Sequence, residues 1–243
     1  MKTKILVGYS TNRDQKFRDK FFKEIKKNIG CKFDVMPIYN SGSMSLTKTY
    51  NKIWETYPFD ESYIFVFIHH DIHFKTNGWG KTLLNLFNNN PDTHIVGVAG
   101  TDCMYKHGVW WLDYKGDFNQ TDLWGKVWHT DGKKNWKSDF TTVNKKCDKI
   151  QPVVALDGVL LAFDPDQCEQ FDEDFDSFHF YDISFCTRNK LANKNIFVTE
   201  TIQILHESEG PIGEEWDKNR LKYLEKYVTA NEVEASLDST TDN

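Results

Sequence analysis

Short apolar segments alternate with helical patterns through the first hundred residues, and this alternation constrains the fold more than any other feature of the sequence. Amphipathic helices are predicted between the strands, because apolar side chains recur every three or four residues around Phe17, Leu46 and Trp79. The predicted strands are Lys4–Val7, Phe33–Ile38, Tyr63–Ile68 and Ile95–Ala99. Strands separated by helices are typical of βαβ units, whose strands lie parallel in one sheet. The sequence therefore predicts an α/β fold of the doubly wound type with a central, mostly parallel sheet.

The periodicity changes beyond Gly100, where a stretch rich in Trp, Tyr, Gly and Asp runs to about Ile150. Loops and short antiparallel strands are expected in that stretch. Farther along, the pattern predicts a strand pair over Val153–Phe163, a helix over Tyr181–Leu191 and a last helix marked by Trp216, Tyr223 and Tyr227. A polar segment follows from Asn231. We therefore expect residues 1–230 to form one domain and residues 231–243 to be a flexible polar tail.

Composition and charge exclude several classes of protein. The chain has 243 residues, of which 39% are hydrophobic and 15% aromatic, so it can bury a substantial core. Its net charge is −6 with the lysines spread along the chain, which gives no electrostatic basis for tight binding to duplex DNA. No signal peptide and no apolar run of membrane-spanning length are present, so a cytoplasmic protein is expected. The five cysteines form no CxxC pair and are expected to be reduced thiols.

The strongest candidate site is the run of polar residues that directly follows the most hydrophobic predicted strand. It contains His69, His70, Asp71 and His73, at the carboxyl end where ligand sites of open α/β sheets gather. A carboxylate with imidazoles suits a divalent cation. Alternation along an extended chain would place His69, Asp71 and His73 on one side. The alternative is a polar strand end whose imidazoles bond to backbone carbonyls, but three histidines around one aspartate favour a metal site.

Two later residues are also candidates for the site. Asp182 stands where an aromatic segment passes into a predicted helix, so it is either a helix cap or a general base. His206 follows the apolar segment Ile202–Leu205 and either completes a metal site begun at Asp71 or is an ordinary loop histidine. Neither residue decides between these interpretations alone.

The segment after the first strand is a candidate for nucleotide binding. Tyr9, Ser10, Thr11 and Asn12 follow Gly8 at the same expected sheet edge, where backbone groups and hydroxyls can hold a nucleobase or ribose. The segment can equally be a plain turn. Neither GxGxxG nor GxxxxGKS/T occurs there, so the sequence supports neither a dinucleotide fold nor a P-loop.

In their order and spacing, these segments resemble the GT-A glycosyltransferases of family 2, in particular a glycosyltransferase-like branch with an HHDI-type motif in place of DxD. The resemblance covers most of the chain. It is strongest in YIFVFIHHDIHF, HIVGVAGTD, LDGVLLAF, FHFYDISFC and ILHESEGPIGEEWDKNR.

The resemblance implies a metal-assisted transfer from a nucleotide-diphosphate sugar, with UDP the commonest nucleotide of the family. Asp71 stands at the carboxylate that binds Mn²⁺ or Mg²⁺, and His206 at a late metal or diphosphate ligand. His69 stands where a standard DxD has its first aspartate, so it binds the metal, touches the ribose or shapes the site.

The same resemblance implies the remaining roles. Asp182 matches the base that deprotonates the acceptor hydroxyl in inverting members, Asp157 a position near the donor sugar, and Tyr9–Asn12 the nucleotide-binding turn. The acceptor is expected to be a sugar, a lipid-linked glycan or, for a phage enzyme, a hydroxymethylated DNA base.

Two alternatives from other classes remain open at this point. A metal-dependent hydrolase would use His69, Asp71, His73 and His206 as ligands that activate water. A non-catalytic module would bind the sugar nucleotide alone. The presence of both a metal carboxylate and a candidate base argues against the non-catalytic module.

Overall fold

The computed structural model describes residues 1–118, 122–130, 136–141, 150–207 and 212–229. The predicted tail, residues 231–243, lies outside the described residues. In the part of the chain that is described, no helix combines the length and the apolar character needed to cross a bilayer.

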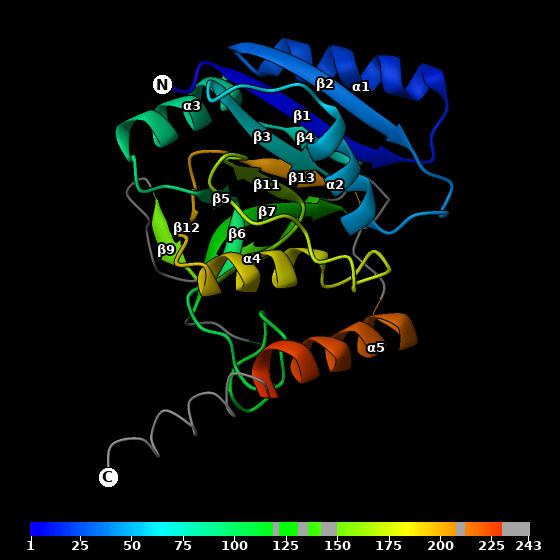
Figure 1. The fold of residues 1–243 in the computed structure, drawn as a ribbon, viewed down its shortest axis with the longest axis vertical. Helices are drawn as coiled ribbons and strands as arrows, with labels where there is room; N and C mark the ends of the chain where they lie inside the picture. The colour runs from blue at the N-terminus through cyan, green and yellow to red at the C-terminus, as the bar shows by residue number, and fades with distance from the viewer. Residues whose placement is uncertain (119–121, 131–135, 142–149, 208–211, 230–243) are drawn as a thin grey trace.

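The main sheet has seven strands in the order β2-β1-β3-β11-β5-β12-β9 (Figure 1). These strands are β1 Lys4–Thr11, β2 Lys32–Tyr39, β3 Tyr63–Ile68, β5 Ile95–Gly97, β9 Gln151–Val153, β11 Leu160–Phe163 and β12 Ile196–Val198. The pairs β1·β2 and β1·β3 are parallel, as predicted, and so is the pair of β5 with β12, a strand that was not predicted. The sheet as a whole is mixed, because β11 lies antiparallel between β3 and β5 and β9 lies antiparallel to β12.

A second sheet has six strands, in the order β10-β6-β7-β13-β4 with β8 paired to β7. Its strands are β4 Ile72–Phe74, β6 Ala99–Thr101, β7 Leu123–Thr130, β8 Trp136–Thr141, β10 Ala155–Leu156 and β13 Ile204–His206. The pairs β6·β7 and β7·β8 confirm short antiparallel strands in the tryptophan-rich stretch. The strand predicted over Ile95–Ala99 is divided at Val98, where the chain passes from one sheet to the other.

The crossing between the two sheets requires a glycine in β7. Gly125 has φ 86°, in the left-handed region, and a Cβ there would lie 2.0 Å from the carbonyl oxygen of Val98. The backbones therefore approach more closely than any side chain allows.

Helices cover both faces of the main sheet, as a doubly wound fold requires (Figure 1). These helices are α1 Gln15–Asn28, α2 Leu46–Thr56, α3 Trp79–Asn89 and α4 Tyr181–Leu191. The last two helical elements are α5 Glu214–Tyr223 and the π-helical segment η1 Leu224–Thr229, and α5 lies apart from the main sheet (Figure 1). The side chains of α1 and α3 pack with Ile5 and Val7 of β1, whereas those of α2 and α4 pack with Leu6. Alternation along β1 thus directs successive residues to opposite layers.

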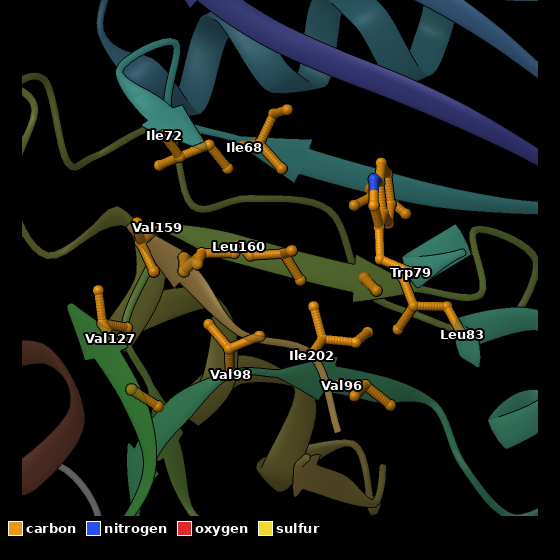
Figure 2. Close-up of a cluster of buried hydrophobic side chains, with 14 of the residues drawn as sticks. Ile68, Ile72, Trp79, Leu83, Val96, Val98, Val127, Val159, Leu160 and Ile202 are labelled. Carbon is orange, nitrogen blue, oxygen red and sulfur yellow. The ribbon is translucent and has the colours of Figure 1, made fainter. Parts of the chain in front are cut away.

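The larger buried cluster continues from α3 into the space between the sheets (Figure 2). Figure 2 shows Trp79 and Leu83 of α3 facing Ile68 and Val96 of the main sheet, with Val127 of β7 across the cluster. This packing fixes the second sheet beside the carboxyl end of β3, where the predicted site begins.

The C-terminal helical segment, made of α5 and η1, is bonded to the loop before α4. Lys226 Nζ lies 2.7 Å from Asp172 Oδ2 and 2.6 Å from Asp174 Oδ2, and the Tyr227 hydroxyl donates to Asp172. The side chain of Phe180 packs against Trp216 of α5, with ring centroids 5.3 Å apart. The segment therefore supports the beginning of α4, which carries Asp182.

Candidate active site

A cavity of about 380 Å³ opens at the carboxyl ends of β1 and β3. Its walls come from the end of β1, the loop after β2, the beginning of α2, the residues after β3 and the segment before α4. This is the edge at which ligand sites of α/β sheets are expected. Its size suits a ligand of nucleotide dimensions.

The predicted nucleotide-binding segment lies partly in the cavity wall and partly in the core. Ser10, Thr11 and Asn12 line the cavity. The side chain of Tyr9 is only 1% exposed and packs edge-on against Phe21, so it is not among the lining residues. The segment is not a turn throughout, because β1 continues to Thr11 through its pairing with β2.

Asn40, which the sequence analysis missed, shapes the opposite wall. Its Nδ2 donates to the carbonyl oxygen of Met44 at 2.8 Å, and its Oδ1 accepts from the backbone N–H of Gly42 at 3.1 Å. The side chain therefore holds the loop after β2 against the cavity. An asparagine directly after a predicted strand and before Ser-Gly-Ser is the available sequence signal, since asparagine commonly bonds to the backbone of a following turn.

His69, Asp71 and His206 come together beside this cavity. His206 Nε2 lies 3.1 Å from His69 Nδ1 and 3.3 Å from Asp71 Oδ1. One ligand atom from each of the three residues lies within 4.8 Å of the others. In octahedral coordination with bonds of about 2.0–2.1 Å, neighbouring ligand atoms lie about 3 Å apart, so the donor set and its spacing fit one divalent cation.

The pairing of β4 with β13 brings these residues together. The two strands are antiparallel with His206 opposite Ile72, and the backbone N–H of Glu207 donates to the carbonyl oxygen of Asp71 at 2.9 Å. The three-residue strand β4 was not predicted. Without it, nothing in the sequence connects residue 71 with residue 206 except the resemblance.

The prediction that His73 faces the same side as His69 and Asp71 was wrong, because a turn at residues 70 and 71 interrupts the alternation of an extended chain. His73 Nδ1 lies 2.7 Å from Glu24 Oε1, and its Nε2 lies 2.8 Å from Glu207 Oε1. Hydrogen bonding to Glu24, and next to Glu207, raises the pKa of His73 to about 9 despite its burial. The ring is therefore a cation that ties α1 to the end of β13, and it is not part of the group formed by His69, Asp71 and His206.

A second buried histidine supports the group from β7. His129 lies opposite His206 in the parallel pairing of β7 with β13, and the two rings meet edge to face with centroids 5.2 Å apart. His129 is 5% exposed and restricts the orientation of the His206 ring. No local pattern distinguishes it, since its role depends on a contact across 77 residues of sequence, from position 129 to position 206.

The electrostatics of His69 favour a neutral ring. Burial, and next the nearby His206, lower the pKa of His69 to about 4. A neutral imidazole carries one N–H and one lone pair, so it can act as a ligand at neutral pH. Its Nε2 lies 2.7 Å from the hydroxyl of Tyr181.

Asp182 lies in the first turn of α4, beside the turn that joins β10 to β11. Its Oδ2 accepts from the N–H of Gly158 at 2.8 Å and its Oδ1 from the N–H of Ile183 at 2.9 Å. Burial, and next the Asp157 carboxylate, raise the pKa of Asp182 to about 7 although these N–H groups oppose the shift. A carboxylate with that pKa can accept a proton near neutral pH, as a general base must.

The turn that contains Asp157 connects the two parts of the site. Asp157 Oδ1 accepts from the N–H of Val159 at 2.9 Å, and the carbonyl oxygen of Val159 accepts from the N–H of His69 at 3.2 Å. Backbone groups of the same turn thus bond to both His69 and Asp182. Neither Asp157 nor Asp182 is among the residues that line the cavity, and the link to it runs through His69, which does line it.

Phe180 begins α4 in an unusual conformation. Its φ is 61° and its ψ is 5°, a left-handed geometry that is rare for a bulky side chain. Packing against Trp216 and Tyr223 of the last helix holds it there. Such conformations concentrate at functional sites, and this one fixes the direction in which Tyr181 and Asp182 leave the backbone.

No curated protein matches the sequence. Among solved structures, the chain is similar to GalNAc-T7 with UDP, GalNAc and Mn²⁺, with a TM-score of 0.54 and 10% identity over 92% of this chain and 48% of that chain. This chain therefore spans about half the length of GalNAc-T7. It is also similar to A197 from STIV, with a TM-score of 0.45 and 10% identity over 85% of this chain and 87% of that chain.

The likeness to GalNAc-T7 concerns the fold, a single α/β domain of the GT-A type. The family comparison covers the same elements, because residues 9–227 match the model of a family described as "Glycosyltransferase like family". That range extends from the end of β1 to η1 and includes His69, Asp71, His206 and Asp182. The chain belongs to the glycosyltransferase-like family.

Proposed function

We propose that the protein transfers a sugar from a nucleotide-diphosphate sugar, most simply a UDP-sugar, to an acceptor hydroxyl with inversion at the anomeric carbon. The observation that carries the proposal is the group formed by His69, Asp71 and His206 at a nucleotide-sized cavity, with Asp182 beside it. Family membership supports the class of reaction.

The donor would occupy the cavity between the end of β1 and the loop held by Asn40. Hydroxyl and amide groups of Ser10, Thr11 and Asn12 face it and can bond to the nucleoside. His69, Asp71 and His206 would hold a divalent cation next to the diphosphate. Two imidazoles in the ligand set suit a transition metal such as Mn²⁺ better than Mg²⁺. When bound, the cation stabilises the negative charge that develops on the departing diphosphate.

The transfer would be a single displacement. The acceptor oxygen attacks the anomeric carbon, the bond from that carbon to the diphosphate oxygen breaks, and its electron pair leaves with the diphosphate. Asp182 takes the proton from the acceptor hydroxyl. Asp157, beside Asp182, would position the donor sugar. Attack opposite the leaving group inverts the anomeric centre.

We favour a sugar or lipid-linked glycan as acceptor over a hydroxymethylated DNA base. Binding to the DNA backbone requires lysines and arginines at the interface, and the chain carries 36 acidic against 30 basic residues. Sugar transfer should be measured with both types of acceptor. Transfer to the modified base would reverse this preference and leave the donor half of the proposal intact.

Thermal unfolding in the presence of nucleoside diphosphates tests the donor site. UDP with Mn²⁺ is expected to raise the melting temperature above the sum of the two separate shifts, because each ligand binds only the folded protein and the cation joins them. Asp71→Ala is the control and should abolish the Mn²⁺-dependent part. If no nucleoside diphosphate shifts the transition with or without Mn²⁺, the proposal is wrong.

A further inference from the structure

Tyr181 makes a contact that the proposed reaction does not by itself explain. Its hydroxyl lies 2.7 Å from His69 Nε2, while His69 Nδ1 faces His206 Nε2 at 3.1 Å. The tyrosine is 3% exposed and immediately precedes Asp182 at the beginning of α4. One imidazole thus has the hydroxyl on one side and the ligand group on the other.

The contact matters because a neutral imidazole has only one lone pair on nitrogen. If Nε2 carries the proton and donates to the Tyr181 oxygen, the Nδ1 lone pair of His69 points toward His206 and Asp71. If Tyr181 instead donates to Nε2, the proton sits on Nδ1 and that nitrogen cannot bind a cation. Ligand histidines commonly give their other N–H to a fixed acceptor, which selects the ligating tautomer.

We propose that Tyr181 is a positioning residue of the metal site: its hydroxyl accepts the Nε2–H of His69 and keeps the Nδ1 lone pair available to a divalent cation. This inference rests on the proposed function. It also assigns His69, whose role the sequence left open among metal, ribose and shape, to the metal.

The surrounding packing confines the hydroxyl to this contact. A Cβ on Gly158 would lie 2.0 Å from the Tyr181 oxygen, so the hydroxyl rests directly on the backbone of the turn before β11. The ring of Tyr50 packs edge-on against that of Tyr181, with centroids 5.8 Å apart. The N–H of the same Gly158 donates to Asp182. One turn therefore positions both the partner of His69 and the candidate base.

Mn²⁺ affinity without nucleotide is the first test, measured from the electron paramagnetic resonance signal of free Mn²⁺. Tyr181→Phe removes only the hydroxyl and is expected to weaken binding about 10- to 100-fold, the usual effect of losing the partner of a ligand histidine. Tyr63→Phe is the matched control, because Tyr63 is 7% exposed, lies at the opposite end of β3 from His69, and its hydroxyl donates to Asp34 Oδ2 at 2.9 Å. The control should leave Mn²⁺ affinity unchanged.

The tautomer of His69 can be read without metal from the ¹⁵N shifts of its ring in a long-range proton–nitrogen correlation spectrum. The wild-type protein is expected to carry the proton on Nε2, and Tyr181→Phe to lose that preference, whereas Tyr63→Phe keeps it. A purely structural tyrosine would not move this signal.

The outcomes separate the two proposals. If the wild-type protein binds no Mn²⁺, with or without UDP, the metal site and this inference both fail. If it binds Mn²⁺ and Tyr181→Phe binds equally well, or if His69 carries its proton on Nδ1 in the wild-type protein, only the role of Tyr181 is overturned.

Discussion

At the scale of single residues, Asp182 and His73 illustrate how position changes the chemistry of a side chain. The pKa of Asp182 is raised to about 7 by burial and by Asp157, whereas the pKa of His73 is raised to about 9 by two carboxylates. The sequence predicted both residues as candidates, because they stand next to apolar segments. It could not separate a base from a helix cap, or a ligand from an ion pair, since those roles depend on partners such as Gly158 and Glu24 that lie far away in sequence.

The base assignment predicts a pH profile. A carboxylate is the active form, so kcat/KM should rise with pH and level off above an apparent pKa near 7. The sign for stability is opposite: the folded pKa lies above the ordinary value of about 3.9, so this group's contribution is lost as pH rises from about 4 through 7. Initial rates and unfolding free energies between pH 5 and 9 check both signs.

Replacement of the base gives a second prediction at this scale. Asp182→Asn removes proton acceptance and keeps the shape of the side chain, so transfer should fall about 10²- to 10⁴-fold. The shift in melting temperature caused by UDP with Mn²⁺ should persist, because Asp182 lies outside the metal-ligand group. A variant that retains wild-type turnover would exclude Asp182 as the base.

At the scale of elements, the short strands decide the site and were the hardest to predict. The long helices and β1–β3 follow from periodicity within their own sequence, and their positions agree with prediction except that β1 continues beyond Val7 to Thr11. β4 and β12 have three residues each, too few for any period to appear. They form because a partner strand lies beside them, as β13 lies beside β4, and a local pattern contains no information on such a partner.

The turn between β10 and β11 gives a prediction at the same scale. In Gly158→Ala the new Cβ would lie 2.0 Å from the Tyr181 oxygen, so the ring or the turn must shift. Overpacking of this kind costs about 1–3 kcal/mol of unfolding free energy, which urea denaturation measures. Gly213→Ala is the control, because a Cβ there meets no atom within 4 Å. Equal stability of the two variants would show that the turn accommodates the added methyl group without strain.

At the scale of the whole molecule, the N-terminal and C-terminal parts of the chain contribute different parts of one site. Most of the cavity wall and Asp71 come from the first part, whereas the wall segment before α4, Asp157, Asp182 and His206 come from the second. The resemblance anticipated this division, whereas length and composition indicated only a chain able to bury a substantial core. The last helical segment completes the arrangement, since Phe180 is held by Trp216 and Tyr223.

The attachment of η1 to the loop before α4 can be weakened by a substitution outside the candidate site. Tyr227→Phe removes a hydrogen bond to the buried carboxylate of Asp172, a loss of about 1.5–3 kcal/mol in unfolding free energy for a bond to a charged group. Mn²⁺ affinity should be unaffected, because His69, Asp71 and His206 do not lie on η1 and the Tyr227 ring, which packs against Tyr223, is kept. Urea denaturation and Mn²⁺ titration of the same sample check the two effects. A parallel loss of Mn²⁺ binding would contradict the separation.

The antiparallel strand β11 has a consequence for how the molecule assembles. Within the main sheet, β2, β1 and β3 form one block and β5, β12 and β9 another, and β11 alone is paired with a strand of each. During synthesis, a chain that has passed its first hundred residues can already pair β1 with its neighbours. Among the described strands, the partners of β5 in the main sheet are β11 and β12, so β5 is unpaired there until residues 160–163 emerge. Closure of the sheet is therefore a late, long-range event, and the group of His69, Asp71 and His206 is also late in synthesis, because His206 follows residue 163 in the chain.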